Sequence, residues 1–430
     1  MAITAKPMDI LILGGGIAGL TTALSLTKFA PTPPNITIFE IRPEPATIGG
    51  AVNLTPNALR LLSHLGALDE IRSAGYGAEC LAVEVFDLYT NLKIAESSFG
   101  GPEGKGLGDP PFTALRITRG EALKGVLAAI SKHPNIKLLC GKKTVSINED
   151  DSSVTIKFED GGSAQGDILI GCDGIHSVTR LKHVDPERKA IYSGICNAFG
   201  FSPRRKLSTS NEYEPTHFSV SGMNFGRRGI LLTSFHAPAR TSIYVGALMQ
   251  VPEIADRNGW RAAGADAAKT RNEMLERHSG AANPLIAHLI EDAEDLFLWP
   301  IFTLSKGGKW ATERVMLIGD SAHAMPPQGE STGIVFEDGV LFSRCLARWM
   351  VTRREEGVPV KEAFDAYENL RRARIDVAFD ESLSVVKTVQ DTTWLGHKIK
   401  MNVVPWYLWW TRGYREKHFV EDVTSCDIGY

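Results

Sequence analysis

Apolar and polar residues in the first forty positions are arranged in a way that predicts a strand, a helix and a second strand. Met8 to Leu13 form a short apolar run, Ile17 to Phe29 carry apolar residues at helical spacing, and Ile36 to Phe39 are β-branched and apolar after a Pro-rich turn. Two strands joined by a helix in this order form a βαβ unit with parallel strands. This part of the chain therefore has the pattern of an α/β fold.

Helical and strand patterns recur in separate blocks along the rest of the chain. Helices are predicted where apolar residues return every three or four positions, at 56–67, 119–131, 268–289, 333–350 and 360–386. Strands are predicted where apolar residues alternate or run together, at 80–96, 154–158, 167–170, 191–249 and 315–318. The Gly- and Pro-rich stretch 100–111 predicts a long loop, and the block 191–249 is the candidate substrate sheet.

The composition is that of an ordinary folded protein. Of the 430 residues, 43% are hydrophobic and 23% are charged, which separates the chain from disordered and fibrous proteins. The formal net charge is -3, and no dense run of Lys and Arg interleaved with aromatic residues could follow a phosphate backbone. We therefore expect no nucleic-acid partner.

The cysteines are widely scattered. They lack the paired spacing of a zinc site and the density of a secreted disulfide scaffold. A reducing compartment, the cytoplasm, is the expected location, and no metal site is expected. The six residues are Cys80, Cys140, Cys172, Cys196, Cys345 and Cys426.

Two segments bear on a possible membrane partner. Ile10 to Thr27 is uncharged, but its glycines and its length, short of the usual ~20 residues, favour a strand, a turn and a helix over a membrane span. Pro405 to Trp410 is rich in Trp, too short to span a membrane but sufficient to cover an apolar surface. We expect a soluble protein with no membrane partner.

A glycine fingerprint lies between the first predicted strand and helix. Gly14, Gly16 and Gly19 match the pattern G-x-G-x-x-G, in which the first glycine permits a tight turn, the second admits a pyrophosphate and the third lets the helix pack on the strand. Glu40 ends the second strand, where a carboxylate can accept hydrogen bonds from a ribose. The pattern predicts a dinucleotide site.

Two later motifs identify the dinucleotide. The first has the sequence CDGIHS from Cys172 to Ser177 and continues to Arg180, and the second has the sequence LIGDSAHAMPP from Leu317 to Pro327. Together with the glycine fingerprint, in this order and at this spacing, they resemble the group A flavin monooxygenases, the family of 4-hydroxybenzoate and salicylate hydroxylases, including its fungal secondary-metabolite members. The resemblance covers most of residues 8–375.

The resemblance implies an α/β fold in which a Rossmann-like FAD-binding domain carries an inserted, mostly antiparallel substrate-binding sheet and is followed by C-terminal helices. The expected division assigns 1–75, 110–183 and 295–345 to the FAD-binding domain. It assigns 76–109 and 184–294 to the substrate-binding sheet, and 346–430 to a C-terminal helical region.

The resemblance also implies roles for individual residues. The three fingerprint glycines would hold the FAD pyrophosphate, and Glu40 the adenosine ribose. Arg119 would reach the phosphate and ribityl region, with Arg42 as a weaker candidate, and a solvated arginine at a helix start is the alternative. Asp173 would lie near FAD and the nicotinamide cofactor, although it could simply cap a turn.

Asp320 would hydrogen-bond the ribityl hydroxyls, whereas His323 is expected to be a packed structural residue. Pro327 and Gly329 would belong to the catalytic loop that faces the flavin, and Gly333 to the helix start whose amides stabilise the reduced ring. The family commonly has Gly-Gln-Gly in this loop, and Ser331 replaces the second glycine. Glu330 could add an unfavourable negative charge.

A further departure concerns the substrate. Where many hydroxylases have an arginine, this chain has Phe199, so an apolar pocket wall and a neutral or weakly acidic aromatic substrate are expected, with His236 and Tyr244 as polar partners. Alternatively, Phe199 only packs in the sheet core, and Arg204 or Arg227 binds an acid. The family's closing helix motif, Tyr367 to Arg374, could instead be a solvated basic helix face.

The implied activity is that of an oxidoreductase, an FAD-dependent NAD(P)H monooxygenase. FAD is the cofactor and NAD(P)H the co-substrate, and O₂ would hydroxylate a small aromatic or polyketide-like substrate through a flavin C4a-hydroperoxide. Epoxidation or oxidative dearomatisation on the same fold is the leading alternative, followed by a flavin oxidase or dehydrogenase without oxygen insertion. A non-catalytic FAD-binding protein and a flavin halogenase fit less well.

Overall fold

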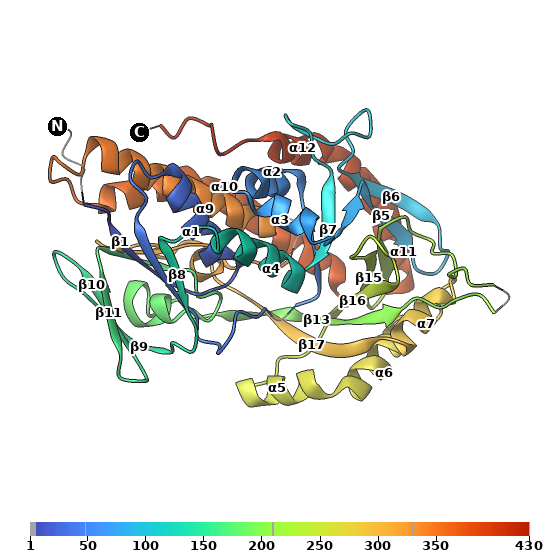
Figure 1. Cartoon of the computed structure of the whole chain (residues 1–430). Coiled ribbons are helices and arrows are strands. Elements are labelled where there is room, and N and C mark those ends of the chain that lie inside the picture. The colour runs from blue at the N-terminus through green and yellow to red at the C-terminus, as the bar shows by residue number, and fades with distance from the viewer. Residues whose placement is uncertain (1–5, 48, 209, 328–330, 430) are drawn as a thin grey trace.

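The computed structural model describes residues 6–47, 49–208, 210–327 and 331–429 (Figure 1). At its centre lies a five-stranded parallel sheet with the order β18-β12-β1-β2-β8. Its strands are β1 (Asp9–Leu13), β2 (Asn35–Phe39), β8 (Ile136–Leu139), β12 (Ile168–Gly171) and β18 (Val315–Leu317). The predicted βαβ unit is therefore observed, with β1 and β2 as neighbours in register.

Two small antiparallel sheets accompany the parallel sheet. One has the order β11-β10-β9 and the other β3-β7-β4. Their strands are β3 (Ala51–Leu54), β4 (Ala78–Cys80), β7 (Ala114–Thr118), β9 (Thr144–Glu149), β10 (Val154–Phe158) and β11 (Ser163–Gly166).

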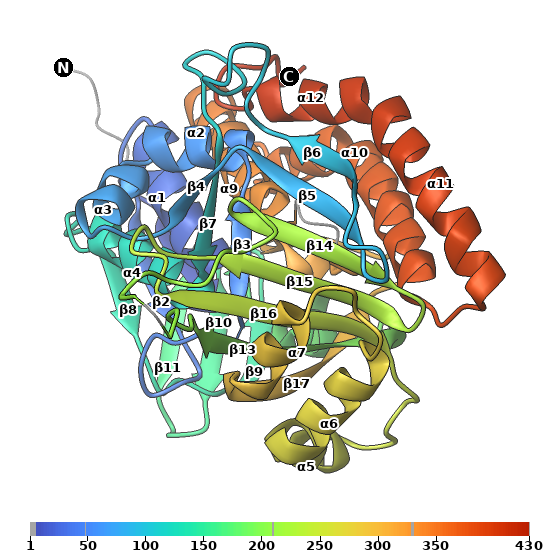
Figure 2. The same ribbon diagram turned by 90° about the vertical axis from the view of Figure 1, so that its right-hand side faces the viewer.

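The large sheet has seven strands in the order β17-β13-β16-β15-β14-β5-β6 (Figure 2). All neighbouring pairs are antiparallel except β14 and β5, which are parallel. The strands are β5 (Ala82–Asp87), β6 (Lys93–Ser98), β13 (Ile191–Pro203), β14 (Ser221–Gly226), β15 (Gly229–Phe235), β16 (Ser242–Gln250) and β17 (Glu294–Thr303). The predicted fold class, with its inserted, mostly antiparallel sheet, is confirmed.

Helices pack against the parallel sheet and against the large sheet. They are α1 (Ile17–Phe29), α2 (Pro56–His64), α3 (Ala67–Ser73), α4 (Arg119–Ile130), η1 (Arg180–Val184), α5 (Arg257–Ala265), α6 (Ala267–Arg277), α7 (Leu285–Glu291), α8 (Asp320–His323), α9 (Ser331–Thr352), α10 (Lys361–Val389), α11 (Trp394–Trp410) and α12 (Arg412–Val420). Within the described residues, no helix combines the length and the apolar character needed to cross a membrane.

Two predicted helices are divided in the structure, and each break has a local cause. The helix expected over 56–67 ends at His64, because Gly66 adopts a positive φ of 75° and α3 starts after it. The helix expected over 268–289 becomes α6 and α7, with Gly280 at φ 79° and Pro284 between them. Glycine tolerates this left-handed conformation, and proline cannot continue a preceding helix.

One strand differs from the domain division expected from sequence. Residues 295–303 were assigned to the FAD-binding domain, but they lie within β17, which pairs along β13 as the edge strand of the large sheet. Its segment Phe297 to Ile301 is an apolar run that contains Pro300, and a proline inside such a run weakens the strand signal. The division as a whole stays a prediction.

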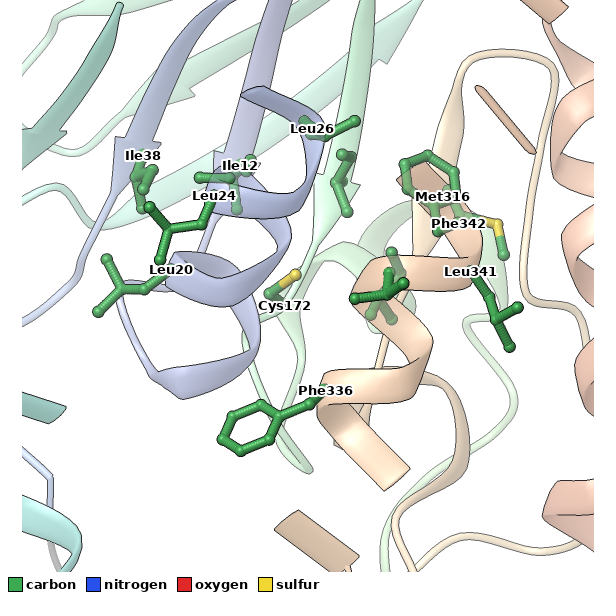
Figure 3. Packing of buried hydrophobic residues seen from close by; sticks show 14 of the residues in the cluster. Ile12, Leu20, Leu24, Leu26, Ile38, Cys172, Met316, Phe336, Leu341 and Phe342 are labelled. Atoms are coloured by element: carbon green, nitrogen blue, oxygen red, sulfur yellow. The ribbon is translucent and has the colours of Figure 1, made fainter. Parts of the chain in front are cut away.

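The main core lies between the parallel sheet, α1 and α9. Figure 3 shows Leu24 of α1 against Ile12 and Ile38 of the sheet, with Leu20 one turn away on the same helix and Phe336 and Phe342 projecting from α9. All of these side chains are buried. Burying side chains of this size contributes roughly 1.5–3 kcal/mol each, so this contact sets where the glycine turn before α1 and the start of α9 lie relative to each other.

A cluster of buried charges fixes α10 against α9. Arg371 Nη1 lies 2.8 Å from Glu337 Oε2, and Arg371 Nε donates to Asp338 Oδ1 at 2.6 Å. Asp338 Oδ2 lies 2.9 Å from His323 Nε2, and Asn57 Nδ2 donates to Glu337 Oε1 at 2.7 Å. The cluster therefore joins α2, α8, α9 and α10 at one point.

The charges of this cluster support one another. Burial would raise the pKa of Asp338, but His323 and Arg371 outweigh burial and hold that pKa below its usual range. Since the pKa is lower in the folded chain than the roughly 3.9 of an unfolded aspartate, the carboxylate contributes stability above that pH. This contribution is lost as the pH falls through the folded-state pKa.

We expect Arg371→Met to lower the free energy of unfolding by roughly 3–5 kcal/mol, because two buried carboxylates would lose their cation. Urea unfolding of the FAD-loaded protein measures the change. Lys361→Met is the matched control on the same helix, since Lys361 pairs with Asp365 at 2.6 Å on the surface, where ion pairs contribute little. Equal losses in the two variants would contradict the expectation.

Candidate active site

The glycine turn after β1 is held by two close backbone approaches. Gly14 adopts φ 109°, and an added Cβ there would lie 2.3 Å from the Cys172 carbonyl oxygen. An added Cβ at Gly19 would lie 2.0 Å from the carbonyl oxygen of Gly14. Both glycines are therefore needed for the turn itself and for packing α1 beside β12, whatever the turn binds.

Gly16 differs from its two neighbours in the fingerprint. It precedes α1 with φ -79°, a conformation open to any residue, and an added Cβ would meet nothing within 4 Å. The turn is therefore open on this side, where the first amides of α1 lack helical partners. A pyrophosphate fits this opening, because helix amides and the absence of a side chain both favour the approach of a phosphate.

Glu40 supports the same turn from the end of β2. Its buried carboxylate accepts a hydrogen bond from the Gly15 amide at 2.8 Å and one from the Arg42 amide at 2.9 Å. A carboxylate has about four acceptor positions, so two remain for the hydroxyls of a ribose. The residues present thus fit the adenosine end of a dinucleotide.

Asp173 and Asp320 follow neighbouring strands but differ in environment. The Asp173 carboxylate accepts hydrogen bonds from the Ser177 hydroxyl at 2.5 Å and from the Thr179 amide at 2.9 Å. Burial raises the pKa of Asp173, although these hydrogen bonds oppose the shift. Asp320 is exposed at the start of α8. Asp173 thus shapes its own turn, whereas Asp320 is free to face a ligand.

Arg180 ties the two motif loops together, a role that the sequence did not reveal. Its guanidinium is fully buried and donates to the carbonyl oxygens of Ile175 at 2.5 Å and Ser321 at 2.8 Å. Arg188 adds a hydrogen bond to the Ala322 carbonyl at 2.7 Å. Burial lowers the pKa of Arg188 to about 10. The two arginines fix the loops after β12 and β18 relative to each other.

Arg119 is exposed at the first position of α4. Its amide donates to the Gly50 carbonyl at 3.1 Å, and its side-chain stem passes over Gly49, where an added Cβ would lie 2.5 Å from Arg119 Cδ. Gly49 leaves room for that stem because it has no Cβ, and glycine also tolerates its φ of 151°. These contacts position the backbone and the stem of Arg119, and the residue is exposed.

The loop between α8 and α9 is described in part. Pro327 is half-buried, whereas Gly329 and Glu330, on which the sequence analysis relied, lie outside the described residues. Gly333 is buried in the first turn of α9, where an added Cβ would lie 3.0 Å from Asn57 Nδ2. The start of α9 is thus packed against α2, beside the buried charge cluster.

The structural role expected for His323 and the solvated face considered for the closing helix motif have different outcomes. His323 is buried and ion-pairs with Asp338, which agrees with a structural role. Arg371 and Tyr367 are also buried, so a solvated basic face is wrong for this part of the closing helix motif. The sequence signal that was missed is the pair Glu337-Asp338 within the otherwise apolar stretch 334–342, because buried carboxylates require a cation.

An aromatic cluster lies where the large sheet meets β3. Phe199 on β13 and Tyr244 on β16 are buried, with ring centroids 6.3 Å apart, and both pack with Ala51 of β3. Phe201, which the sequence analysis did not select, lies 5.8 Å from Tyr244 and 5.0 Å from His236. The structure thus brings together all three expected substrate residues.

Several polar atoms of this wall have no hydrogen-bond partner among the described residues. They include both ring nitrogens of His236 and Asn197 Oδ1. Burial lowers the pKa of His236, so the neutral imidazole is favoured. The Asn197 amide donates to the Tyr244 hydroxyl at 3.4 Å. Buried polar atoms are rarely left unsatisfied, so these atoms point to a ligand.

Arg116 is a candidate site residue that the sequence did not single out. It is buried on β7, donates from Nε to the Ser234 hydroxyl at 2.8 Å, and lies over the Tyr244 ring, 5.3 Å from its centroid. No carboxylate of the described chain pairs with it, and burial lowers its pKa. An arginine inside the apolar segment Ala114 to Thr118 was the available signal.

The two arginines named as alternatives lie elsewhere. Arg204 donates to the Glu214 carbonyl at 2.8 Å and stacks on Tyr213 and Phe235. Arg227 is exposed and stacks on Tyr89. Neither belongs to the aromatic cluster, so Arg116 is the cation beside it.

Comparisons with known proteins agree with this arrangement. A family model described as FAD binding domain matches residues 7–190. The chain is 26% identical to 3-amino-4-hydroxybenzoate 2-monooxygenase of Streptomyces cremeus, over 86% of this chain and 84% of that protein. It is 28% identical to a salicylate hydroxylase of Pseudomonas putida, over 84% of this chain and 82% of that protein.

The fold is shared with solved flavoproteins. The structure of Klebsiella pneumoniae HpxO complexed with FAD and uric acid matches with a TM-score of 0.74 and 19% identity, over 98% of each chain. These comparisons define the chain as a flavoprotein with FAD as its cofactor. They confirm the resemblance to group A FAD-dependent aromatic monooxygenases, and the protein is an FAD-dependent monooxygenase. Its assignment to the fungal members stays a prediction.

The contrast between Gly14 and Gly16 yields a test of the cradle. We expect Gly16→Ala to fold normally but to weaken FAD binding about tenfold or more, because the methyl group would occupy the opening. Gly14→Ala should instead destabilise the fold, since its Cβ would clash with the Cys172 carbonyl. Thermal unfolding without FAD and FAD titration separate the two effects. Unchanged FAD affinity in Gly16→Ala would contradict this use of the opening.

Proposed function

We propose that this enzyme hydroxylates a small, neutral or weakly acidic aromatic substrate with NAD(P)H and O₂. The observation that carries the proposal is the aromatic cluster of Phe199, Phe201 and Tyr244, with unpartnered polar atoms and Arg116 beside it. This cluster lies on the sheet that faces β3 and β7, the strands leading to the FAD-binding elements. An apolar wall with a few polar groups is typical of a small-molecule site.

In this proposal, FAD occupies the glycine turn and the loops after β12 and β18. Gly16 and the α1 amides contact the pyrophosphate, Glu40 the adenosine ribose, and Arg119 and Asp320 the phosphate and ribityl region. The start of α9 at Gly333, with Pro327, faces the ring. Bound FAD supplies the redox chemistry, accepting electrons from NAD(P)H and activating O₂. The chain supplies binding, orientation and exclusion of water.

The substrate ring would pack between Phe199, Phe201 and Tyr244, with its hydroxyl at Asn197 or His236. A buried cation favours the ionised form of a nearby weak acid. Arg116 would therefore make a phenol more electron-rich by favouring phenolate, and attack on an electron-rich ring carbon is easier. Phe199 stands where many hydroxylases have an arginine, and this argues against a benzoate whose carboxylate lies on the Phe199 side of the ring, because that side is apolar.

We also propose that the protein works in the cytoplasm. All six cysteines are described by the structure and are free, and four of them are buried. Burial raises the pKa of Cys172 and the pKa of Cys345, so these thiols resist ionisation. A reducing compartment suits such thiols.

Oxygen transfer is tested directly with isotopic oxygen. We expect NAD(P)H oxidation to accelerate when neutral phenols are added, less so with benzoates, and one atom from ¹⁸O₂ to appear in the product. Mass spectrometry of the product makes the measurement. Hydrogen peroxide without labelled product would identify an oxidase, and halide-dependent product would identify a halogenase. Rapid coupled turnover of salicylate would overturn the substrate proposal.

The role of Arg116 has its own test. We expect Arg116→Met to lower kcat/KM for a phenol by about ten- to a hundredfold, from losing one charge-assisted interaction of roughly 1.5–3 kcal/mol. The accompanying loss in kcat should shrink at a pH high enough to ionise the bound phenol without the cation. Arg204→Met, which removes a cation outside the cluster, is the control. FAD absorbance and thermal unfolding establish that each variant is folded, and a pH-independent loss would contradict the phenolate role.

A further inference from the structure

Helix α11 has one packed side and one exposed apolar side. On the packed side, Met401, Val404 and Leu408 lie against the cluster of buried residues between the large sheet and α10, and His397 Nε2 lies 3.1 Å from Asp87 Oδ1. These contacts suffice to hold the helix on the molecule. Figure 2 shows α11 as the outermost of the C-terminal helices, beside β6 and α10.

The other side of α11 forms a continuous apolar face that is rich in Trp. Leu395, Ile399, Val403, Trp406 and Trp410 follow one another at spacings of four, four, three and four residues, which places them on one side of a helix. We call these residues together with Trp409 the aromatic face, and its members are between 51% and 70% exposed. The rings of Trp406 and Trp410 stack with centroids 5.6 Å apart. Exposed apolar surface of this kind marks an interaction site.

The helix that carries the aromatic face and the helix after it are basic, while Glu96 of β6 lies across the groove from them. No Asp or Glu occurs from Trp394 to Arg415. Helices α11 and α12 carry five basic residues and one acidic residue, Glu416, which is paired with Arg412 at 2.7 Å. Lys398 is exposed and lies 4.7 Å from the Trp394 ring centroid, and Lys417 is exposed on α12. The surroundings therefore complement an anionic surface.

A groove opens beside the same face. It has a volume of about 240 Å³ and lies between β6 and the helices α11 and α12. Ile94 and Ala95 line it on one side, and Leu408 and Trp409 on the other. Because Trp409 belongs both to the groove and to the aromatic face, an apolar chain reaching the face could enter the groove.

We propose that α11 lies flat in the surface of an anionic lipid membrane, with the aromatic face among the headgroups and upper acyl chains. Trp rings prefer this interface, and basic residues add attraction to anionic lipids. A second copy of the chain fits less well, since a two-fold interface would bring two basic regions together. The expectation of no membrane partner rested on the length needed to span a bilayer, and a helix lying in the interface has no such requirement.

Vesicle flotation of the FAD-loaded protein tests the proposal. We expect the protein to float with phosphatidylcholine vesicles that contain phosphatidylserine, more weakly without phosphatidylserine, and more weakly at high salt. Trp406→Ser with Trp410→Ser should lower the apparent affinity about tenfold or more. Val351→Ser is the matched control, because Val351 is 68% exposed, as is Trp410, but lies at the end of α9.

Brominated lipids provide a second readout that does not depend on activity. Bromine on the upper acyl chain should quench the Trp fluorescence of the native chain and of Val351→Ser, but much less that of the double variant. FAD absorbance establishes that all variants are folded. No flotation with either lipid mixture, or equal flotation of the double variant, would overturn the proposal. So would a lipid-free dimer of the native chain that the double variant abolishes, because the face would then be a protein interface.

Discussion

The buried guanidinium of Arg371 is the contact on which the geometry of the site depends. It neutralises Glu337 and Asp338 at the start of α9, and through them it engages Asn57 on α2 and His323 on α8. Buried charges without partners are strongly unfavourable, so the cluster favours the observed arrangement of these four helices, in which each charge has a partner. That arrangement puts the start of α9 opposite the glycine turn of α1.

Two further buried arginines fix the loops at one end of the parallel sheet. Arg180 and Arg188 bind backbone carbonyls rather than carboxylates, and they join the loop that holds Asp173 to the loop that begins with Asp320. The loops at the carboxyl ends of parallel strands are where α/β sheets bind ligands. With these loops fixed, the exposed residues Arg119 and Asp320 and the unobstructed backbone at Gly16 are available to the cofactor.

The apolar residues of the large sheet and those of helix α11 lie in different environments. Phe199, Phe201 and Tyr244 are buried around polar atoms that have no partner in the described chain, an environment suited to a small aromatic ring. The Trp residues of α11 lie at the surface, beside basic residues, an environment suited to the headgroup region of a membrane. A membrane-bound enzyme with such a pocket would be well placed for aromatic substrates that partition into lipid.

The sequence by itself determined the βαβ unit and the dinucleotide fingerprint, because hydrophobic periodicity and a short motif are local properties of the chain. The resemblance carried by its three motifs added the mostly antiparallel insertion and the flavoprotein class. It also brought Phe199, His236 and Tyr244 into consideration. Only the tertiary structure decided that Arg116 is the cation beside them, that Arg371 is buried, that Asp173 is occupied by its own turn and that β17 joins the large sheet. Each of these depends on partners more than thirty positions away or on backbone hydrogen bonding, and burial of a charge is decided by those partners rather than by its neighbours in sequence.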